Sequence, residues 1–192
     1  LENMIRTADK DINSEEVVFY LKSPVDDGGV WNLFYNIGEK YGVVPQEVMP
    51  ETEHSNNTSQ MIGVIKIRLK KAGWDLRETY AAKSNFKKND KKAKAELENA
   101  LKEVKMAALK DVYRVLALCL GEPPTEFTWR YKNKEGKIVS VKTTPKEFYK
   151  NIVPADYNPS ENIMIMNDPT REYYKVYEIQ NYRNSVEGIN WV

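Results

Sequence analysis

Side chains able to perform covalent catalysis are scarce in this sequence, which contains one cysteine, Cys119, and one histidine, His54. A nucleophilic enzyme requires a thiol or hydroxyl beside a general base that a third polar group orients. Cys119 falls on an apolar helical pattern with Val112 and Val115, where cysteine usually packs as a small hydrophobic residue. His54 lies in a polar stretch, which favours a solvated or capping role. The sequence therefore predicts that neither residue is catalytic.

The spacing of the other polar residues gives no support for metal or phosphate binding. Metal ions need clustered ligands, and the scattered carboxylates form no recognisable ligand pattern with the one histidine and the one cysteine. Asp26 and Asp27 are adjacent, so we expect them to cap the following helix and to interact favourably with its dipole. The glycine pairs lack the flanking residues of a phosphate-binding loop. We expect neither a metal ion nor another cofactor.

One local cluster of positive charge contrasts with a formal net charge of +1, which gives no overall reason to expect a polyanionic partner. The cluster surrounds Phe86 and consists of Lys83, Lys87, Lys88, Lys91, Lys92 and Lys94. We interpret this lysine cluster as a solvated turn between two helices. The alternative is a nucleic-acid-binding segment whose lysines contact phosphates.

The composition bounds the class of protein. A chain of 192 residues with 41% hydrophobic residues is expected to fold as one unit. A single cysteine cannot form an internal disulfide, which favours a reducing compartment and predicts a cytoplasmic protein. No apolar run approaches the about 20 residues of a membrane span, so no membrane association is expected. Because the chain starts at Leu1 rather than at a methionine, we expect this end to be a boundary within a longer protein.

Apolar residues at helical spacing predict three helices. The first covers residues 26–41 and is closed by Gly42, which can adopt the left-handed conformation that often ends a helix. Its apolar face consists of Val30, Phe34, Ile37 and Tyr41. Two longer helices, from about Asn57 to Tyr80 and from Leu97 to Cys119, are separated by a polar break and predict a helical hairpin. The tryptophans are expected mostly in the core: Trp31, Trp74, Trp129 and Trp191.

The pattern changes after Pro124. Alternating residues from Phe127 to Tyr131, a turn at residues 133–136 and apolar residues at 138–141 predict a β-hairpin. Thr144-Pro145-Lys146-Glu147 is a capping box with proline in the first helical position, which predicts a short helix through Tyr149. The last two expected strands, residues 163–166 and 174–179, are separated by Asn167-Asp168-Pro169.

Several short motifs follow one another along the chain. They are Asp27-Gly28-Gly29-Val30-Trp31, residues 39–45, Met49-Pro50-Glu51, residues 55–58, residues 118–124, Phe127-Thr128-Trp129, residues 144–149 and Asn167-Asp168-Pro169. In this order they resemble the bleomycin hydrolase and aminopeptidase C family of papain-like cysteine peptidases, over almost the whole chain. The resemblance implies an α+β fold: the central segment of a papain-like peptidase, with an inserted long helical hairpin followed by a β-hairpin and short strands.

The resemblance also implies a division of the chain into three parts. Residues 1–54 would belong to the peptidase core with the cleft-lining glycines, residues 55–124 would form the inserted helical hairpin, and residues 125–192 would lead back to the core. The family order is cysteine, histidine, asparagine, with the cysteine upstream of the glycine pair and the histidine downstream of the last strands. Neither Cys119 nor Asn184 matches a catalytic motif. The resemblance thus implies that this chain alone is inactive.

The resemblance further implies a substrate-binding role for Gly28 and Gly29, with Asp27 and Trp31 beside them. In papain-like enzymes the second glycine of such a pair forms backbone hydrogen bonds with the substrate residue two before the cut. A peptide can approach a backbone edge only where no side chain intervenes. A pure turn or capping role for the glycines is the alternative, and helix packing is an alternative role for Trp31.

For the parent protein, the resemblance implies a cytosolic thiol aminopeptidase that acts on peptides and assembles as a hexamer through its inserted elements. An amphipathic hairpin is compatible with such assembly. The main alternative is a non-catalytic helical interaction module. Nucleic-acid binding through the lysine cluster is the less favoured one.

Overall fold

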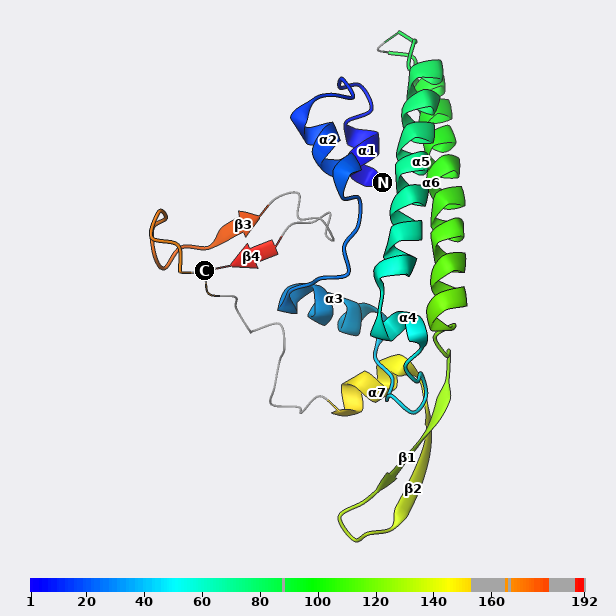
Figure 1. Ribbon diagram of the computed structural model, residues 1–192, viewed down its shortest axis with the longest axis vertical. Coiled ribbons are helices and arrows are strands. Elements are labelled where there is room, and N and C mark those ends of the chain that lie inside the picture. Colours follow the sequence, from blue (N-terminus) through cyan, green and yellow to red (C-terminus); the bar gives the residue numbers. More distant parts are fainter. Residues whose placement is uncertain (88, 153–164, 166, 180–188, 192) are drawn as a thin grey trace. The chain divides into compact units, whose positions relative to one another are not determined.

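The computed structural model describes residues 1–87, 89–152, 165, 167–179 and 189–191. Figure 1 shows the elements in chain order: α1 Glu2–Arg6, α2 Glu15–Lys22, α3 Trp31–Tyr41, α4 Glu53–Asn56, α5 Ser59–Lys83, α6 Lys91–Leu120, β1 Phe127–Lys132, β2 Ile138–Thr143, α7 Pro145–Ile152, β3 Tyr177–Ile179 and β4 Ile189–Trp191. Among these residues, no helix combines the length and the apolar character needed to cross a bilayer.

The chain forms two compact units. Residues 1–27 and 53–120 make up the first, and residues 28–52 and 121–192 the second. Residues 1–27 thus pack with the helical hairpin. The boundaries at 54 and 124 that the resemblance implied stay a prediction.

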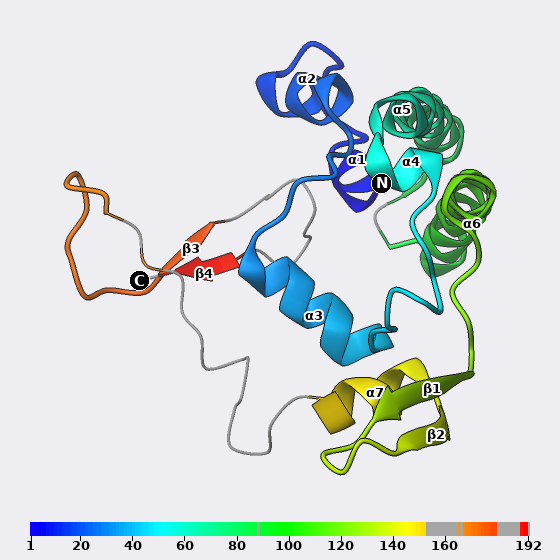
Figure 2. The same cartoon turned by 60° about the horizontal axis from the view of Figure 1, so that its bottom comes forward.

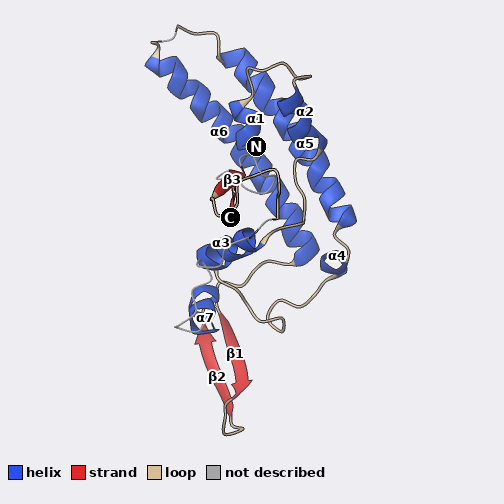
Figure 3. Cartoon of the chain, turned by 90° about the vertical axis from the view of Figure 1, so that its left-hand side faces the viewer, coloured by secondary structure: helices blue, strands red, loops and turns tan. Residues whose placement is uncertain are grey.

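The first unit is built on the helical hairpin, which the sequence predicted correctly. α5 and α6 run antiparallel and side by side (Figures 1 and 3), and α6 ends before Gly121, whose φ of 84° is left-handed. α1 and α2 pack against the hairpin and complete a small core. The buried residues of this core are Met4, Val17, Leu76, Leu97 and Leu101.

Arg77 joins α1 to α5 by polar contacts. Its Nη1 donates to the Thr7 carbonyl oxygen at 2.8 Å, and its Nη2 donates to the Lys10 carbonyl oxygen. Both carbonyl groups belong to the turn that follows α1, so Arg77 holds this turn against α5. α1 has only five residues, too few for a stable isolated helix, and it depends on such tertiary contacts.

The second unit contains the predicted β-hairpin and capping box. β1 and β2 pair antiparallel, with Phe127 opposite Thr143. The Thr144 Oγ1 accepts from the Glu147 backbone N–H at 3.3 Å, and the Glu147 carboxylate accepts from the Thr144 N–H at 3.1 Å. This reciprocal pair starts α7, which lies against the hairpin (Figure 2). There the buried Phe148 ring contacts Trp129, with ring centroids 4.9 Å apart.

α3 packs against α7 through its closing glycine. Gly42 has φ 80° and ψ −173°, and a Cβ atom there would lie 2.2 Å from the Pro145 carbonyl carbon. The next amide, Val43 N–H, donates to the Pro145 carbonyl oxygen at 3.2 Å. The predicted closure of this helix by Gly42 is confirmed, and the structure adds a second requirement: the backbone of α7 occupies the space of a side chain.

The last strands differ from the expectation. β3 begins at Tyr177 rather than at residue 174, because Tyr174 has a positive φ of 62°, which an extended strand cannot contain. β3 pairs with β4, which the sequence pattern did not predict. The expected strand at residues 163–166 lies, except for Ile165, outside the described residues. Asn167-Asp168-Pro169 does form a turn, in which the Asp168 carboxylate accepts from the Thr170 N–H at 3.0 Å.

Candidate functional site

Gly28 and Gly29 lie in an exposed segment without helix or strand pairing, between α2 and α3. Neither adopts the left-handed conformation, which among the described glycines occurs at Gly42, Gly121 and Gly136. A Cβ atom at Gly28 would meet no atom within 4 Å, and one at Gly29 would meet only Leu33 Cδ1 at 3.8 Å, an ordinary contact. Neither backbone conformation nor close packing within the described residues therefore explains why both positions are glycine.

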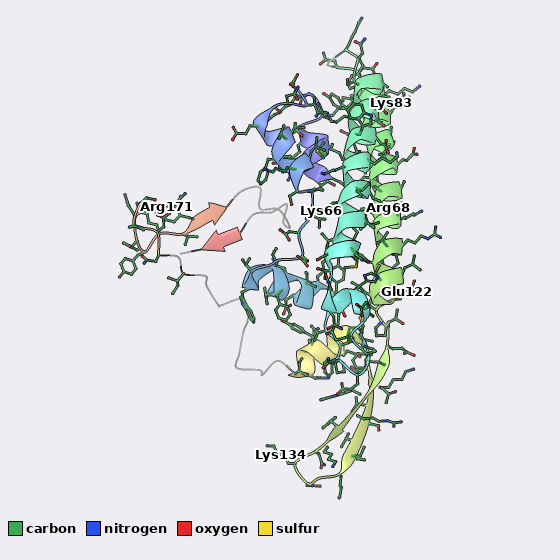
Figure 4. The ribbon with its side chains drawn as sticks, viewed as in Figure 1. Lys66, Arg68, Lys83, Glu122, Lys134 and Arg171 are labelled. Carbon is green, nitrogen blue, oxygen red and sulfur yellow. The ribbon has the colours of Figure 1, made fainter. Side chains whose placement is uncertain are left out.

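Asp27 immediately precedes the glycine pair and has a distant partner. Its carboxylate accepts a hydrogen bond from the Thr58 hydroxyl, although the two residues are 31 positions apart. This bond holds the pKa of the Asp27 carboxyl below its ordinary value. The Asp27 backbone N–H contributes next, and the Lys66 ammonium adds a smaller effect. Lys66 and Arg68 both lie on α5 (Figure 4), and Arg68 forms a salt bridge with Asp111 of α6.

The predicted capping of α3 by Asp26 and Asp27 is wrong. α3 begins at Trp31, its N-cap is Val30, and no side chain caps it. The Asp26 carboxylate instead accepts from the Asp27 N–H at 2.9 Å. The two carboxylates lie too far before the first helical turn to reach its free N–H groups, because capping requires the residue directly at the helix start.

Trp31 is the first residue of α3 and is 40% exposed. Its ring lies tilted against the Phe34 ring, with the ring centroids 5.5 Å apart. The predicted apolar face of α3 remains exposed at Phe34, Ile37 and Tyr41. The expectation that the tryptophans are mostly core is thus wrong for Trp31 and for Trp74, which is 53% exposed. Trp129 is half-buried, and the side chain of Trp191 lies outside the described part.

The candidate nucleophile and base occupy helices. Cys119 is half-buried near the end of α6 rather than in the core. His54 is half-buried in the short helix α4, where the sequence suggested a loop. In the described part of the chain, no cluster of three or more histidine, cysteine or carboxylate side chains could hold a metal ion.

The described lysines of the cluster lie beside the turn between α5 and α6: Lys83 ends α5 (Figure 4), Lys87 lies in the turn, and Lys91, Lys92 and Lys94 lie in the first turn of α6. Phe86 is turned inward and packs against the core of the first unit. The Lys94 Nζ lies 3.9 Å from the Oε1 of Glu98, which is four residues further along α6. The only aromatic ring in the cluster is therefore not presented for stacking on a base, which weakens the nucleic-acid alternative.

Sequence reasoning missed Thr58 as the partner of Asp27. Thr58 is polar and directly precedes the long helix α5, where a solvent-facing role is usual. Thr58 does stand at the end of one of the ordered motifs, residues 55–58, and that was the only signal that could have drawn attention to it. A contact between side chains 31 residues apart does not appear in any local pattern.

Comparisons with known proteins agree with the order of the motifs. A profile of the Peptidase C1-like family matches residues 1–192. Aminopeptidase C of Lactobacillus helveticus is 34% identical over 190 residues, which cover 97% of this chain and 39% of that protein. Human bleomycin hydrolase is 32% identical over 175 residues, covering 90% of this chain and 36% of that protein.

A solved structure extends the likeness to the fold. The crystal structure of PepW from Lactobacillus rhamnosis HN001 superposes with a TM-score of 0.82 at 32% identity, covering all of this chain and 41% of that one. This confirms the expected α+β segment of a papain-like peptidase. The chain spans about two fifths of the length of the relatives that it matches. On the match over all of its residues, the chain belongs to the Peptidase C1-like family, together with aminopeptidase C and bleomycin hydrolase.

Proposed function

We propose that this chain is a segment of a cysteine-type aminopeptidase and that it supplies one wall of the peptide-binding cleft through Gly28 and Gly29. The observation that carries the proposal is the exposed glycine pair, where the chain itself has room for a side chain and yet has none. The names of the relatives, aminopeptidase C and bleomycin hydrolase, support the reaction class.

An extended peptide needs an unobstructed backbone edge with which its own backbone can pair. A substrate that pairs with a backbone edge uses N–H and C=O groups, and a side chain on the facing residue would hold the two backbones apart. Glycine avoids this at a cost in conformational entropy. Because neither a left-handed φ nor close packing among the described residues requires glycine at these two positions, we infer that contact with a ligand backbone is the reason for it. Asp27 and Trp31 would flank the bound peptide.

The test is Gly29→Val in the full-length protein, with turnover of an amino-acid amide or short peptide as the readout. We expect kcat/KM to fall by about tenfold or more, since a backbone hydrogen bond left unmade contributes about 1–3 kcal/mol. Gly29→Ala should show a smaller loss. Gly63→Ala is the matched control, because Gly63 on α5 also has open space around a Cβ atom. Unchanged turnover in Gly29→Val, with a normal melting temperature, would contradict the cleft assignment.

We further propose that neither Cys119 nor His54 is the catalytic nucleophile or base, so that this segment alone does not hydrolyse peptides. The support is that each is half-buried on a helix and that neither lies in a motif typical of a peptidase nucleophile or base. In the full-length protein, Cys119→Ser should keep full activity, and a thiol-alkylating reagent should still inactivate that variant. Loss of activity in Cys119→Ser would refute this assignment.

For the parent protein we propose self-association, with a hexamer as in the family, and a cytoplasmic location. An exposed apolar stripe on α6 supports association: Met106, Leu109 and Tyr113 are exposed, and Leu116 and Leu120 continue the row as half-buried residues. Their spacing of three and four residues is that of a helix–helix seam. Leu109→Lys with Tyr113→Lys should lower the mass measured by light scattering. Ile67→Lys, on the exposed surface of α5, is the control.

A further inference from the structure

The hydrogen bond between Thr58 and Asp27 connects the start of the helical hairpin to the residue before the glycine pair. Thr58 is the N-cap residue of α5, and its hydroxyl donates to the Asp27 carboxylate. Asp27 is joined to Gly28 by a single peptide bond. A constraint on Asp27 therefore acts directly on the backbone that enters the glycine pair.

Thr58 does not use its hydroxyl as an N-cap residue normally does. A threonine in this position usually accepts a hydrogen bond from an N–H in the first helical turn. Here no side chain of the N-cap residue makes that bond, and the preceding Asn57 Oδ1 accepts from the Ser59 N–H at 3.2 Å instead. The Thr58 hydroxyl is thus engaged with Asp27 rather than with its own helix.

The glycine pair is followed directly by the start of α3. The Val30 carbonyl oxygen accepts from the Leu33 N–H at 3.0 Å and from the Phe34 N–H at 3.3 Å, as expected of the N-cap residue of α3. Two successive glycines have more backbone freedom than any other pair of residues. A restraint on Asp27 therefore limits the conformations open to the backbone that enters the pair.

We propose that Thr58 is a positioning residue for peptide binding: by holding Asp27 it fixes the backbone on which Gly28 and Gly29 face the substrate. This inference rests on the proposed function of the glycine pair and adds to it a residue from the inserted hairpin. The substrate class is the same, a peptide bound by its backbone.

The test compares isosteric variants of the full-length protein. Thr58→Val removes the hydroxyl and keeps the shape, and we expect KM for a short peptide to rise about three- to tenfold with kcat within about twofold, as for a lost hydrogen bond. Thr58→Ser keeps a hydroxyl and should restore KM. Thr79→Val is the matched control, because the Thr79 hydroxyl donates to the Asp75 carbonyl oxygen within α5. An unchanged KM in Thr58→Val overturns the proposal.

Gly29→Val separates failure of this inference from failure of the proposed function. If Gly29→Val impairs turnover and Thr58→Val leaves KM unchanged, the positioning role is wrong and the cleft assignment stands. If Gly29→Val also leaves turnover unchanged, the proposed function itself is wrong. If Thr58→Val does not fold, Asp27→Asn replaces it: the weaker acceptor should raise KM by a similar factor, and an unchanged KM overturns the proposal.

Discussion

Gly42→Ala tests the requirement for glycine at the end of α3. The native backbone at this position, φ 80° and ψ −173°, belongs to a region that is essentially restricted to glycine. An added Cβ atom would also lie 2.2 Å from the Pro145 carbonyl carbon and 2.4 Å from the Lys146 nitrogen. Both of these atoms belong to the backbone, so no side-chain rotation can relieve the overlap.

The expected destabilisation combines two effects. Backbone strain of this kind costs about 1–3 kcal/mol. Moving α3 away from α7 also breaks the hydrogen bond from the Val43 N–H to the Pro145 carbonyl oxygen, which contributes about 0.5–1.5 kcal/mol. The sum is about 1.5–4.5 kcal/mol of local stability, which corresponds to about 10- to 2,000-fold faster exchange of the Val43 amide hydrogen.

Hydrogen-exchange mass spectrometry of the native protein measures this effect at the affected amide. Gly136→Ala is the matched control, since Gly136 has φ 77° but open space around a Cβ atom. Gly136→Ala should lower the local stability of the turn between β1 and β2 by about 1–2 kcal/mol and leave the Val43 amide protected from exchange. If Gly42→Ala leaves the exchange of Val43 unchanged, or if both variants affect it equally, the argument from close packing is wrong.

Two further predictions concern named hydrogen bonds. Thr144→Val removes the capping box of α7, and we expect the protection of the Phe148 amide against hydrogen exchange to fall by about 1 kcal/mol. Thr144→Ser keeps the hydroxyl and should remain close to the native protein. Equal protection in the native protein and both variants would contradict the cap. In Thr58→Val the pKa of Asp27, followed by carboxyl NMR, should rise towards its ordinary value, because the largest cause of its depression is removed. In the native protein, the contribution of ionised Asp27 to folding stability is fully present above the pKa that this carboxyl has in the unfolded chain. It is lost as the pH falls through the lowered pKa of the folded protein. An Asp27 pKa that does not move in the variant would show that the hydroxyl is not the cause.

Local patterns predicted the local elements well. The three- and four-residue spacing gave both long helices, and the capping box at Thr144 and Glu147 located the start of α7, because each of these signals lies within a few neighbouring residues. The sequence did not predict β4, because three residues are too few to show an alternation of apolar and polar side chains. The order of the motifs identified the family, which no single element could have done.

Contacts between distant residues could not be predicted in this way. The sequence placed Phe86 in a solvated turn because lysines surround it, yet the ring packs inward, since burial of an aromatic ring is favourable even where its neighbours remain in water. Asp27 looked like a helix cap because of its position before an apolar pattern. Its actual partner, Thr58, is 31 residues away along the chain, and the two meet only because both belong to the first compact unit.

The central claim is that the glycine pair forms a substrate-facing backbone edge, and a crystal structure of the full-length protein with a bound substrate-like peptide tests it most directly. The account predicts that the peptide lies extended along Gly28 and Gly29 and that its backbone forms hydrogen bonds with the N–H and C=O groups of Gly29, with donor–acceptor distances of about 2.7–3.2 Å. A peptide bound in the active site without contact to either glycine would contradict the account.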